Sequence, residues 1–262
     1  MIIVGERLNS SRKPVLEALE RKDEAYLISE ALRQEEAGAH FIDLNTAALL
    51  DRESEILEWA IPLIQKETDT ALSIDTPNPE AIERGLRIHQ GKAMLNSLNL
   101  DKHKIERLLP VIKEYKPYIV VLCMEESYLP KTSEEELSVA TKMVTLLEKE
   151  GISTDHIFVD PLVHPIGVDQ GAALLFLDSL TKIKKSLYGV KTIAGLSNVS
   201  FGLPKRKLIN RTFLTLALSC GLDAAILDPL DKDLKESLFA AQALLGKDPG
   251  LKEYLAFIRS KQ

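Results

Sequence analysis

Short apolar runs alternate with longer amphipathic stretches along almost the whole chain. Runs rich in Ile, Val, Leu and Ala predict eight strands, at residues 2–4, 40–43, 71–75, 92–96, 118–122, 156–160, 191–195 and 224–228. Between them, apolar residues recur at helical spacing over residues 13–20, 24–36, 53–67, 79–89, 103–115, 133–151, 169–187, 206–220 and 232–245. Gly38, Gly151 and Gly221 stand just past three of these stretches, where a helix commonly ends.

Strands that alternate with helices predict parallel pairing through right-handed crossovers. At this length the pattern is most economically a single closed (β/α)8 barrel, a TIM barrel, that spans residues 1–262 as one domain. An open doubly wound sheet is the alternative, but it would usually carry a GxGxxG sequence after its first strand, where this chain has GERLN. Within residues 169–187, Leu174, Leu177, Ile183 and Leu187 fit one buried helix face, and LKEYLAFIRS near the C-terminus predicts a final short helix.

The composition is that of an ordinary globular protein. The 262 residues include 33 Lys and Arg against 39 Asp and Glu, a net charge of −6, with the two signs interspersed. This distribution argues against nucleic acid or an anionic membrane surface as a partner. No apolar run approaches the roughly 18 residues of a membrane helix, and the N-terminus does not read as a signal peptide, so we expect a cytoplasmic protein. Cys123 and Cys220 lie in apolar runs, which favours buried, inert thiols.

Polar side chains follow the predicted strands, at the end of a barrel where such enzymes place their chemistry. Each of these side chains could instead cap the next helix, but their convergence on one ring favours a binding site. In strand order they are Glu6 and Asn9, Asp43 and Asn45, Asp75, Asn96, Met124 and Glu125, Asp160, Ser197 and Asn198, and Asp228.

The kinds of side chain in this ring narrow the ligand. His164 is the one histidine near a strand end, and no His/Cys cluster has metal-ligand spacing, so we predict no zinc centre, although an oxygen-only metal site remains open. No lysine ends a strand, which argues against a Schiff-base aldolase, and the loop after Gly195 lacks the glycine run that would hold a phosphate. Carboxylates and carboxamides suit a flat heterocycle that bears amino, ring N–H and carbonyl functions.

Seven segments carry a family resemblance: GERLN (5–9), EAGAHFIDLN (36–45), SIDTPN (73–78), AMLNSLN (93–99), FVDPLVHP (158–165), GLSNVSFGLPKRKLINRTFL (195–214) and CGLDAAILDPLD (220–231). In this order they resemble the pterin-binding barrel family, and within it the methyltetrahydrofolate:corrinoid methyltransferases. The GLSNVS…R…LINRTF block is the most specific of them. SIDTPN and FVDPL alone would indicate only the wider family, which includes dihydropteroate synthase.

The resemblance implies a role for each matching residue on the pyrimidine side of the pterin. Asp75, Asn96 and Asp160 match the family's pterin-holding residues. The two carboxylates would read the amino-pyrimidine N–H edge, and Asn96 would reach another ring heteroatom. Glu125 departs from the family pattern, in which an asparagine is more usual after Met124.

The resemblance also assigns the loop after residue 195. Asn198 matches an asparagine near N5 of the pterin, Gly195 and Ser197 shape its loop, and Arg206 matches an arginine of the family's loop pattern. We therefore expect catalysis to involve Asn198 together with Asp75 and Asp160.

The activity that the resemblance implies is methyl transfer between N5 of methyltetrahydrofolate and the cobalt of a corrinoid (cobalamin), which a partner protein carries. Cobalt supplies the nucleophile, so the difficulty lies at N5, which must be protonated or strongly hydrogen-bonded in the transition state. Asn198 has no acidic proton to give, but its hydrogen bond can strengthen as charge develops, and the proton would arrive through water or a network. The family also implies a homodimer. The sequence leaves the direction of transfer open.

Two other functions remain open on the sequence. A dihydropteroate-synthase-like enzyme would condense a pterin pyrophosphate with p-aminobenzoate. However, PLVHP follows Asp160 where that enzyme has a glycine-rich segment, and Leu-Ser-Asn follows Gly195 where it has a lysine region. A non-catalytic folate-binding protein would bind methyltetrahydrofolate and leave Co(I) unchanged.

Overall fold

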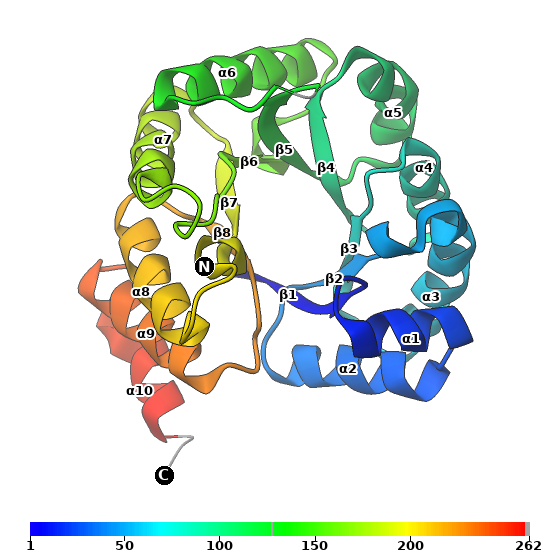
Figure 1. Cartoon of the computed structure of the whole chain (residues 1–262), viewed down its shortest axis with the longest axis horizontal. Coiled ribbons are helices and arrows are strands. Elements are labelled where there is room, and N and C mark those ends of the chain that lie inside the picture. The colour runs from blue at the N-terminus through cyan, green and yellow to red at the C-terminus, as the bar shows by residue number, and fades with distance from the viewer. Residues whose placement is uncertain (127, 260–262) are drawn as a thin grey trace.

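Eight parallel strands close into a barrel in the computed structural model, which describes residues 1–126 and 128–259 (Figure 1). The strands pair in sequence order, and β1 also pairs with β8, so the sheet closes on itself. This confirms the closed barrel over the open doubly wound sheet. The strands are β1 (Ile2–Asn9), β2 (Phe41–Asn45), β3 (Ala71–Asp75), β4 (Met94–Leu100), β5 (Tyr118–Glu125), β6 (Ile157–Asp160), β7 (Lys191–Gly195) and β8 (Ala224–Leu227).

Helices form a ring outside the strands (Figure 1). Five of them, α2, α4, α5, α6 and α9, begin with a side chain that accepts a backbone N–H of the first turn, as capping residues do. The helices are α1 (Lys13–Arg21), α2 (Glu24–Glu36), α3 (Glu53–Glu67), α4 (Pro79–Ile88), α5 (Lys102–Tyr115), α6 (Ser133–Lys149), α7 (Ala172–Ser186), α8 (Arg206–Ser219), α9 (Lys232–Leu244) and α10 (Lys252–Arg259), with 3-10 turns η1 (Ala47–Arg52), η2 (Thr154–His156), η3 (Leu196–Ser200) and η4 (Pro249–Leu251).

Apolar side chains fill the half of the barrel interior nearest the N-terminal ends of the strands. The ring of Tyr118 packs edge-on against Phe41 and Phe158, with ring centroids 5.7 Å apart in both pairs. Because this half is solid, the interior can admit a ligand only from the opposite end. We call this group the interior plug, and its buried members are Val4, Phe41, Met94, Val120, Phe158, Ile193 and Ala224.

The predicted strands are all present, and β3 and β7 have the predicted bounds. β1 is much longer than predicted because its polar half also pairs with β2, as far as Asn9 opposite Asn45. Glu6 and Arg7 interrupt the apolar pattern that marks a strand, so the sequence hid this extension. The helix ends predicted at Gly38, Gly151 and Gly221 are confirmed, since all three glycines have positive φ angles, of 83°, 83° and 106°.

Two burial predictions are wrong. Leu174 is 72% exposed because it lies two residues before the buried Phe176, on the opposite side of α7. Cys220 is only half-buried because it caps the C-terminal end of α8, where the chain leaves the helix layer, whereas Cys123 is fully buried as predicted. The final short helix is confirmed as α10, which packs against α9. None of the helices in the described ranges is both long and apolar enough to cross a membrane.

Glu136 is a buried acid that the sequence did not single out. It lies in the first turns of α6 with no exposed surface, and it faces the Ser179 hydroxyl of α7. Burial raises the pKa of its carboxyl to about 8, the Ser179 hydroxyl lowers it somewhat, and the charge of Asp160 raises it further. Glu136 is therefore protonated in the folded chain at neutral pH and ionised in the unfolded chain.

We expect Glu136→Gln to flatten the pH dependence of stability. In the wild type the folded state binds the extra proton between about pH 4.5 and 8, so the free energy of unfolding falls as pH rises through that window, by up to about 1.4 kcal/mol per unit. The amide keeps the shape of the neutral acid and removes this loss. Urea unfolding of both proteins from pH 5 to pH 8 measures it, and parallel stability curves would contradict the assignment.

Candidate active site

Polar side chains form the layer of the barrel interior that lies next to the interior plug. Successive side chains on a strand alternate between its two faces, so the residue two positions past a plug residue also points inward. On β1, β2, β4 and β6 these residues are Glu6, Asp43, Asn96 and Asp160. Four of the predicted strand-end residues therefore share one interior layer as a direct result of strand periodicity.

Hydrogen bonds join the ends of β2, β3 and β4 into one cluster. Asn45 pairs in register with Asp75, and Asp75 with Asn96, so the three residues lie level with one another. Asn45 Nδ2 donates to Asp75 Oδ2 at 2.7 Å. Asp43 Oδ1 accepts from Asn96 Nδ2 at 3.1 Å and from Ser73 Oγ at 2.6 Å. Four sequence-predicted site residues are thus brought together, and Ser73 joins them.

Asp43 and Asp75 are neighbouring buried acids that influence each other's pKa. Burial, and then the nearby charge of Asp75, raise the pKa of Asp43 well above its usual range. Burial also raises the pKa of Asp75, but bonds from Asn45 and Asp43 and the charge of Lys104 work against that rise. The pKa of Asp43 is thus raised more than that of Asp75, and an Asp43 proton can be donated to Asp75. Asp75 is therefore the member of the pair better suited to accept hydrogen bonds from a ligand.

Asp160 is held by backbone N–H groups. Its Oδ1 accepts from Leu162 N at 2.8 Å, and the Gly195 N–H also bonds to the carboxyl group. Burial nevertheless raises the pKa of Asp160 to about 7, while these two bonds lower it. Asp160 is thus a carboxyl group that can gain or lose a proton near neutral pH.

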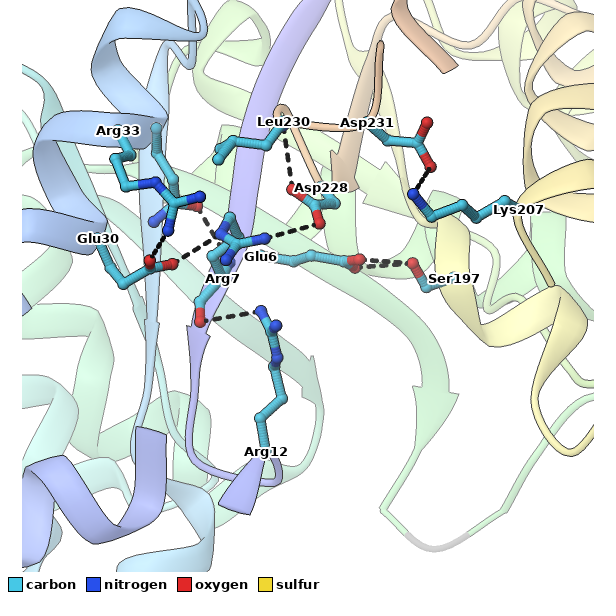
Figure 2. A network of polar contacts seen from close by, with 11 residues as sticks. Glu6, Arg7, Arg12, Glu30, Arg33, Ser197, Lys207, Asp228, Leu230 and Asp231 are labelled. Carbon is cyan, nitrogen blue, oxygen red and sulfur yellow. Dashed lines mark hydrogen bonds and ion pairs between the residues drawn. The ribbon is translucent and has the colours of Figure 1, made fainter. Parts of the chain in front are cut away.

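The segment after β7 is braced on two sides. Ser197 Oγ donates to the Glu6 carboxylate, at 2.7 Å and 2.9 Å to its two oxygens (Figure 2). Arg206, the first residue of α8, donates from Nη2 to the Ser197 carbonyl at 2.7 Å. Asn198 is exposed, and its Nδ2 lies 3.0 Å from the place where a side chain on Gly195 would begin, so a larger residue there would crowd the amide. Burial raises the pKa of Glu6, and the Ser197 bond lowers it.

Other predicted residues lie apart from these contacts. Asn9 Oδ1 accepts from Ser11 N at 2.9 Å and so stabilises the turn after β1. Asp228 accepts from Arg7 Nη1 at 3.0 Å and from Leu230 N at 3.0 Å (Figure 2). Met124 is half-buried on β5, and Glu125 bonds Lys142 Nζ at 2.5 Å. His164, after β6, is half-buried.

Three supporting residues were not predicted from the sequence. Ser10 Oγ donates to Asn45 Oδ1 at 2.8 Å and accepts from Ala48 N at 3.0 Å, which orients the amide toward Asp75. Ser73 bonds Asp43, and Lys104 places a positive charge near Asp75 from the first turn of α5. Alternation within β3 could have indicated Ser73, two residues before Asp75, but nothing in the sequence marks Lys104. Across residues 1–126 and 128–259, no group of three or more His, Cys, Asp or Glu could hold a metal ion.

Comparisons with known proteins define the class. The model of the pterin binding enzyme family matches residues 5–228, and the chain belongs to this family. A relative from Eubacterium limosum named methylcorrinoid:tetrahydrofolate methyltransferase is 33% identical over 256 residues, which cover 97% of this chain and 94% of the relative.

Solved structures of dihydropteroate synthases share the fold. The enzyme from Yersinia pestis with a pterine-sulfa conjugate has a TM-score of 0.70 and 16% identity, over 94% of this chain and 93% of its own. The enzyme from Xanthomonas albilineans in complex with 7,8-dihydropteroate has a TM-score of 0.67 and 19% identity, over 83% and 84%. At these identities the likeness concerns the barrel alone.

We expect Asp43→Asn and Asp43→Ala to differ sharply in stability. If Asp43 is a neutral acid, the amide reproduces its shape and its hydrogen bonds, so the free energy of unfolding at pH 7 should change by less than about 1 kcal/mol. The alanine variant leaves Ser73 and Asn96 without their buried acceptor and should lose about 2–3 kcal/mol. Urea unfolding measures both. Equal losses in the two variants would mean that Asp43 is ionised.

Proposed function

We propose that this chain is a methyltransferase that moves a methyl group between the cobalt of a corrinoid, carried by a partner protein, and N5 of tetrahydrofolate. The observation that carries the proposal is its similarity over almost its whole length to the methylcorrinoid:tetrahydrofolate methyltransferase of Eubacterium limosum. Membership of the pterin binding enzyme family supports a pterin as the ligand. The polar layer above the interior plug offers the carboxylates and amides that a pterin ring needs.

In the proposed complex the amino-pyrimidine edge of the pterin lies against Asp75, Asn96 and Asp160. Asp75 and Asp160 accept N–H bonds, and Asn96 bonds another ring heteroatom. The larger rise in the pKa of Asp43 supports this arrangement, because it favours Asp75 as the ionised member of the pair, and charge-assisted hydrogen bonds are roughly twice as strong as neutral ones.

Methyl transfer to N5 requires N5 to lose a proton, and methyl transfer from N5 requires N5 to gain one. The relative's name gives the methylcorrinoid as donor, and we adopt that direction. The N5 lone pair then forms a bond to the methyl carbon, the cobalt–carbon bond breaks with its electron pair left on cobalt, and cobalt is reduced from Co(III) to Co(I). N5 must release its proton afterwards. In the reverse direction N5 gains the proton as its bond to the methyl group breaks.

Asn198 is the residue that we place at N5. Its exposed side chain amide makes no hydrogen bond to the described residues and is therefore available to a ligand. An amide is not a proton donor in the acid–base sense, so Asn198 acts as a preorganised dipole whose bond to N5 changes in strength as N5 gains or loses charge. Gly195 leaves space for this amide, and Ser197, Glu6 and Arg206 hold its backbone.

Asp160 is the group that we assign to proton exchange with N5, through water. Its pKa of about 7 means that the carboxyl exists in both forms at neutral pH, so it can serve either direction of transfer. Asp43 is less suited to this role because its proton can be donated to Asp75.

No specific observation favours the two alternative functions. The dihydropteroate synthase structures share the barrel with this chain, but Asp160 is followed here by proline and leucine, and its carboxyl is bonded by Leu162 N instead of by a glycine-rich turn. Release of pyrophosphate from a pterin pyrophosphate would reveal that activity. A purely folate-binding protein would need no buried carboxyl group that titrates around pH 7, and the proposed proton exchange uses such a group in Asp160.

The proposal includes partners and location. We infer that a corrinoid protein docks over the open end of the barrel, that the chain works in the cytoplasm, and that it forms a homodimer. Exposed leucines on the neighbouring helices α7 and α8 support a dimer: Leu174, Leu208 and Leu216 are 72%, 49% and 48% exposed. Light scattering on the purified chain tests the dimer.

The proposed activity predicts a change in the cobalt spectrum. Anaerobic Co(I) cobalamin mixed with methyltetrahydrofolate and this protein should convert to methyl-Co(III) cobalamin at a rate proportional to the protein concentration. A separate mixture of tetrahydrofolate, methylcobalamin and the protein tests the opposite direction by the same spectral change in reverse. Binding of the folate by calorimetry without any conversion, even with a corrinoid protein supplied, would reduce the function to binding.

Asn198→Ala should reduce the rate and leave folate affinity nearly unchanged. Loss of one donor at a developing charge costs about 3 kcal/mol, which corresponds to a rate loss of roughly a hundredfold. Asp75→Asn is the matched comparison, because Asp75 is placed only at the pyrimidine edge and its loss should weaken folate binding first. Calorimetry and single-turnover methyl transfer separate the two effects. An unchanged rate for Asn198→Ala would remove Asn198 from the site.

A further inference from the structure

A cavity of about 930 Å³ opens beside the end of β1, between the segment after β8 and the helices α2, α8 and α9. Five basic side chains line it, those of Arg7, Arg33, Lys207, Lys232 and Lys235, beside the acidic side chains of Glu36, Asp228 and Asp231. Figure 2 shows the part of its wall that holds Arg7, Arg33 and Lys207. We call it the rim cavity, and nothing in the proposed methyl transfer uses it.

Three of these cations have acidic partners. Arg7 Nε donates to Glu30 at 2.7 Å and its Nη1 to Asp228 at 3.0 Å, and Arg33 also donates to Glu30. Lys207 Nζ lies 3.3 Å from an Asp231 carboxylate oxygen. These ion pairs neutralise the charges and fix the wall of the rim cavity, so the three residues offer little free charge to a ligand.

Lys232 and Lys235, in the first turns of α9, differ from the other three. Neither forms an ion pair with a carboxylate in the described part of the chain. Lys235 is half-buried, its Nζ donates to the Ala37 carbonyl at 2.7 Å, and burial alone lowers its pKa. A partly desolvated ammonium without a counter-ion is stabilised by an anion brought close to it. The rim cavity therefore holds two cations that an acidic ligand would stabilise.

The position of the rim cavity matches the direction in which a bound folate would extend. In the closed ring of eight strands, β3 and β4 stand across from β7 and β8. A pterin whose pyrimidine ring lies against Asp75 and Asn96, with N5 at Asn198, therefore points its C6 substituent toward β7, β8 and β1. The contact between Ser197 and Glu6 joins these elements, and Arg7, the next residue along β1, already lines the rim cavity (Figure 2).

We propose that the rim cavity binds the glutamyl tail of the folate substrate, with Lys232 and Lys235 as the cations that meet its carboxylates. The tail begins at the p-aminobenzoyl group on C6, and each γ-linked glutamyl residue adds one carboxylate. The proposal rests on the proposed function, since it takes a folate as the ligand. It predicts that the protein binds folates with several glutamyl residues more tightly, a preference that the pterin-holding residues alone would not produce.

Calorimetry with methyltetrahydrofolate that carries one or three glutamyl residues tests the proposal. Partly exposed ion pairs contribute modestly, so we expect the triglutamyl form to bind about fivefold more tightly at low salt, with the difference shrinking as salt is added. The double variant Lys232→Glu/Lys235→Glu should lose this difference and keep the affinity for the monoglutamyl form. Lys131→Glu/Lys149→Glu, at exposed positions before and on α6, changes the net charge by the same amount, so it is the matched control and should keep the difference.

Equal affinity of the wild type for the two folates would overturn the proposal. An equal loss in the Lys131/Lys149 control would also overturn it, because the effect would then follow net charge. Displacement of the triglutamyl folate by an equal concentration of free tri-γ-glutamate would assign the rim cavity to acidic peptides in general and overturn the folate assignment. Failure of the proposed function itself is seen separately, as no methyl transfer and no binding with the monoglutamyl form.

Discussion

Burial of acidic side chains inside a closed parallel barrel is the constraint on which the site depends. The interior plug seals one end, and strand periodicity places Asp43, Asn96 and Asp160 in the next layer. Carboxyl groups in such a place retain protons to a higher pH than they do in water, because the charged form loses its hydration. The same desolvation that opposes folding at high pH thus produces the neutral Asp43 and the Asp160 that titrates near pH 7.

The β2–β4 side and the β7 side of the site have different hydrogen-bonding properties. On the side of β2 to β4, Ser73 and Asn96 donate to Asp43 and Asn45 donates to Asp75, so the site presents a fixed pattern of acceptors and donors. On the side of β7, Asn198 has no such partner, and its backbone is fixed from behind by Arg206 and from the side by Glu6. A fixed pattern suits recognition of a ring edge, whereas an unsatisfied amide on a braced backbone suits an atom whose charge changes during the reaction.

The sequence predicted the barrel well because the fold follows from alternation, which is a local property. It failed where a residue's partner lies far away in the chain. Glu6 is polar, yet β1 continues past it because Leu8 and Asn9 pair with β2, and Ser197, almost two hundred residues later, supplies the partner of the Glu6 carboxylate. Leu174 has the right character for a buried helix face, but only the position of β6 and β7 decides which side of α7 faces inward.

The site shows the same division between local and distant information. Strand ends supplied the right positions for Asp43, Asn45, Asp75, Asn96 and Asp160, since parallel strands all deliver their ends to one face. The sequence did not show which residues contact which. Asn9 and Asp228 stand at strand ends as Asp75 does, but they bond a turn and an arginine outside the cluster. Lys104 and Glu136 lie on helices, where a charged residue ordinarily reads as solvated surface.

The chain shares its barrel with dihydropteroate synthases, but the proposed methyl transfer makes different demands on the groups around N5 and C6 of the pterin. A methyl transfer to cobalt needs N5 accessible from the open end of the barrel and a proton acceptor nearby, and it needs the rest of the folate kept out of the way of a bulky corrin ring. A tail drawn sideways over β8 and β1 into the rim cavity would satisfy the last requirement, because that cavity is lined by residues of α2, α8 and α9, outside the strands. In the proposed complex, Lys232 and Lys235 on α9 would thus connect the binding of the tail to the access that the corrinoid requires.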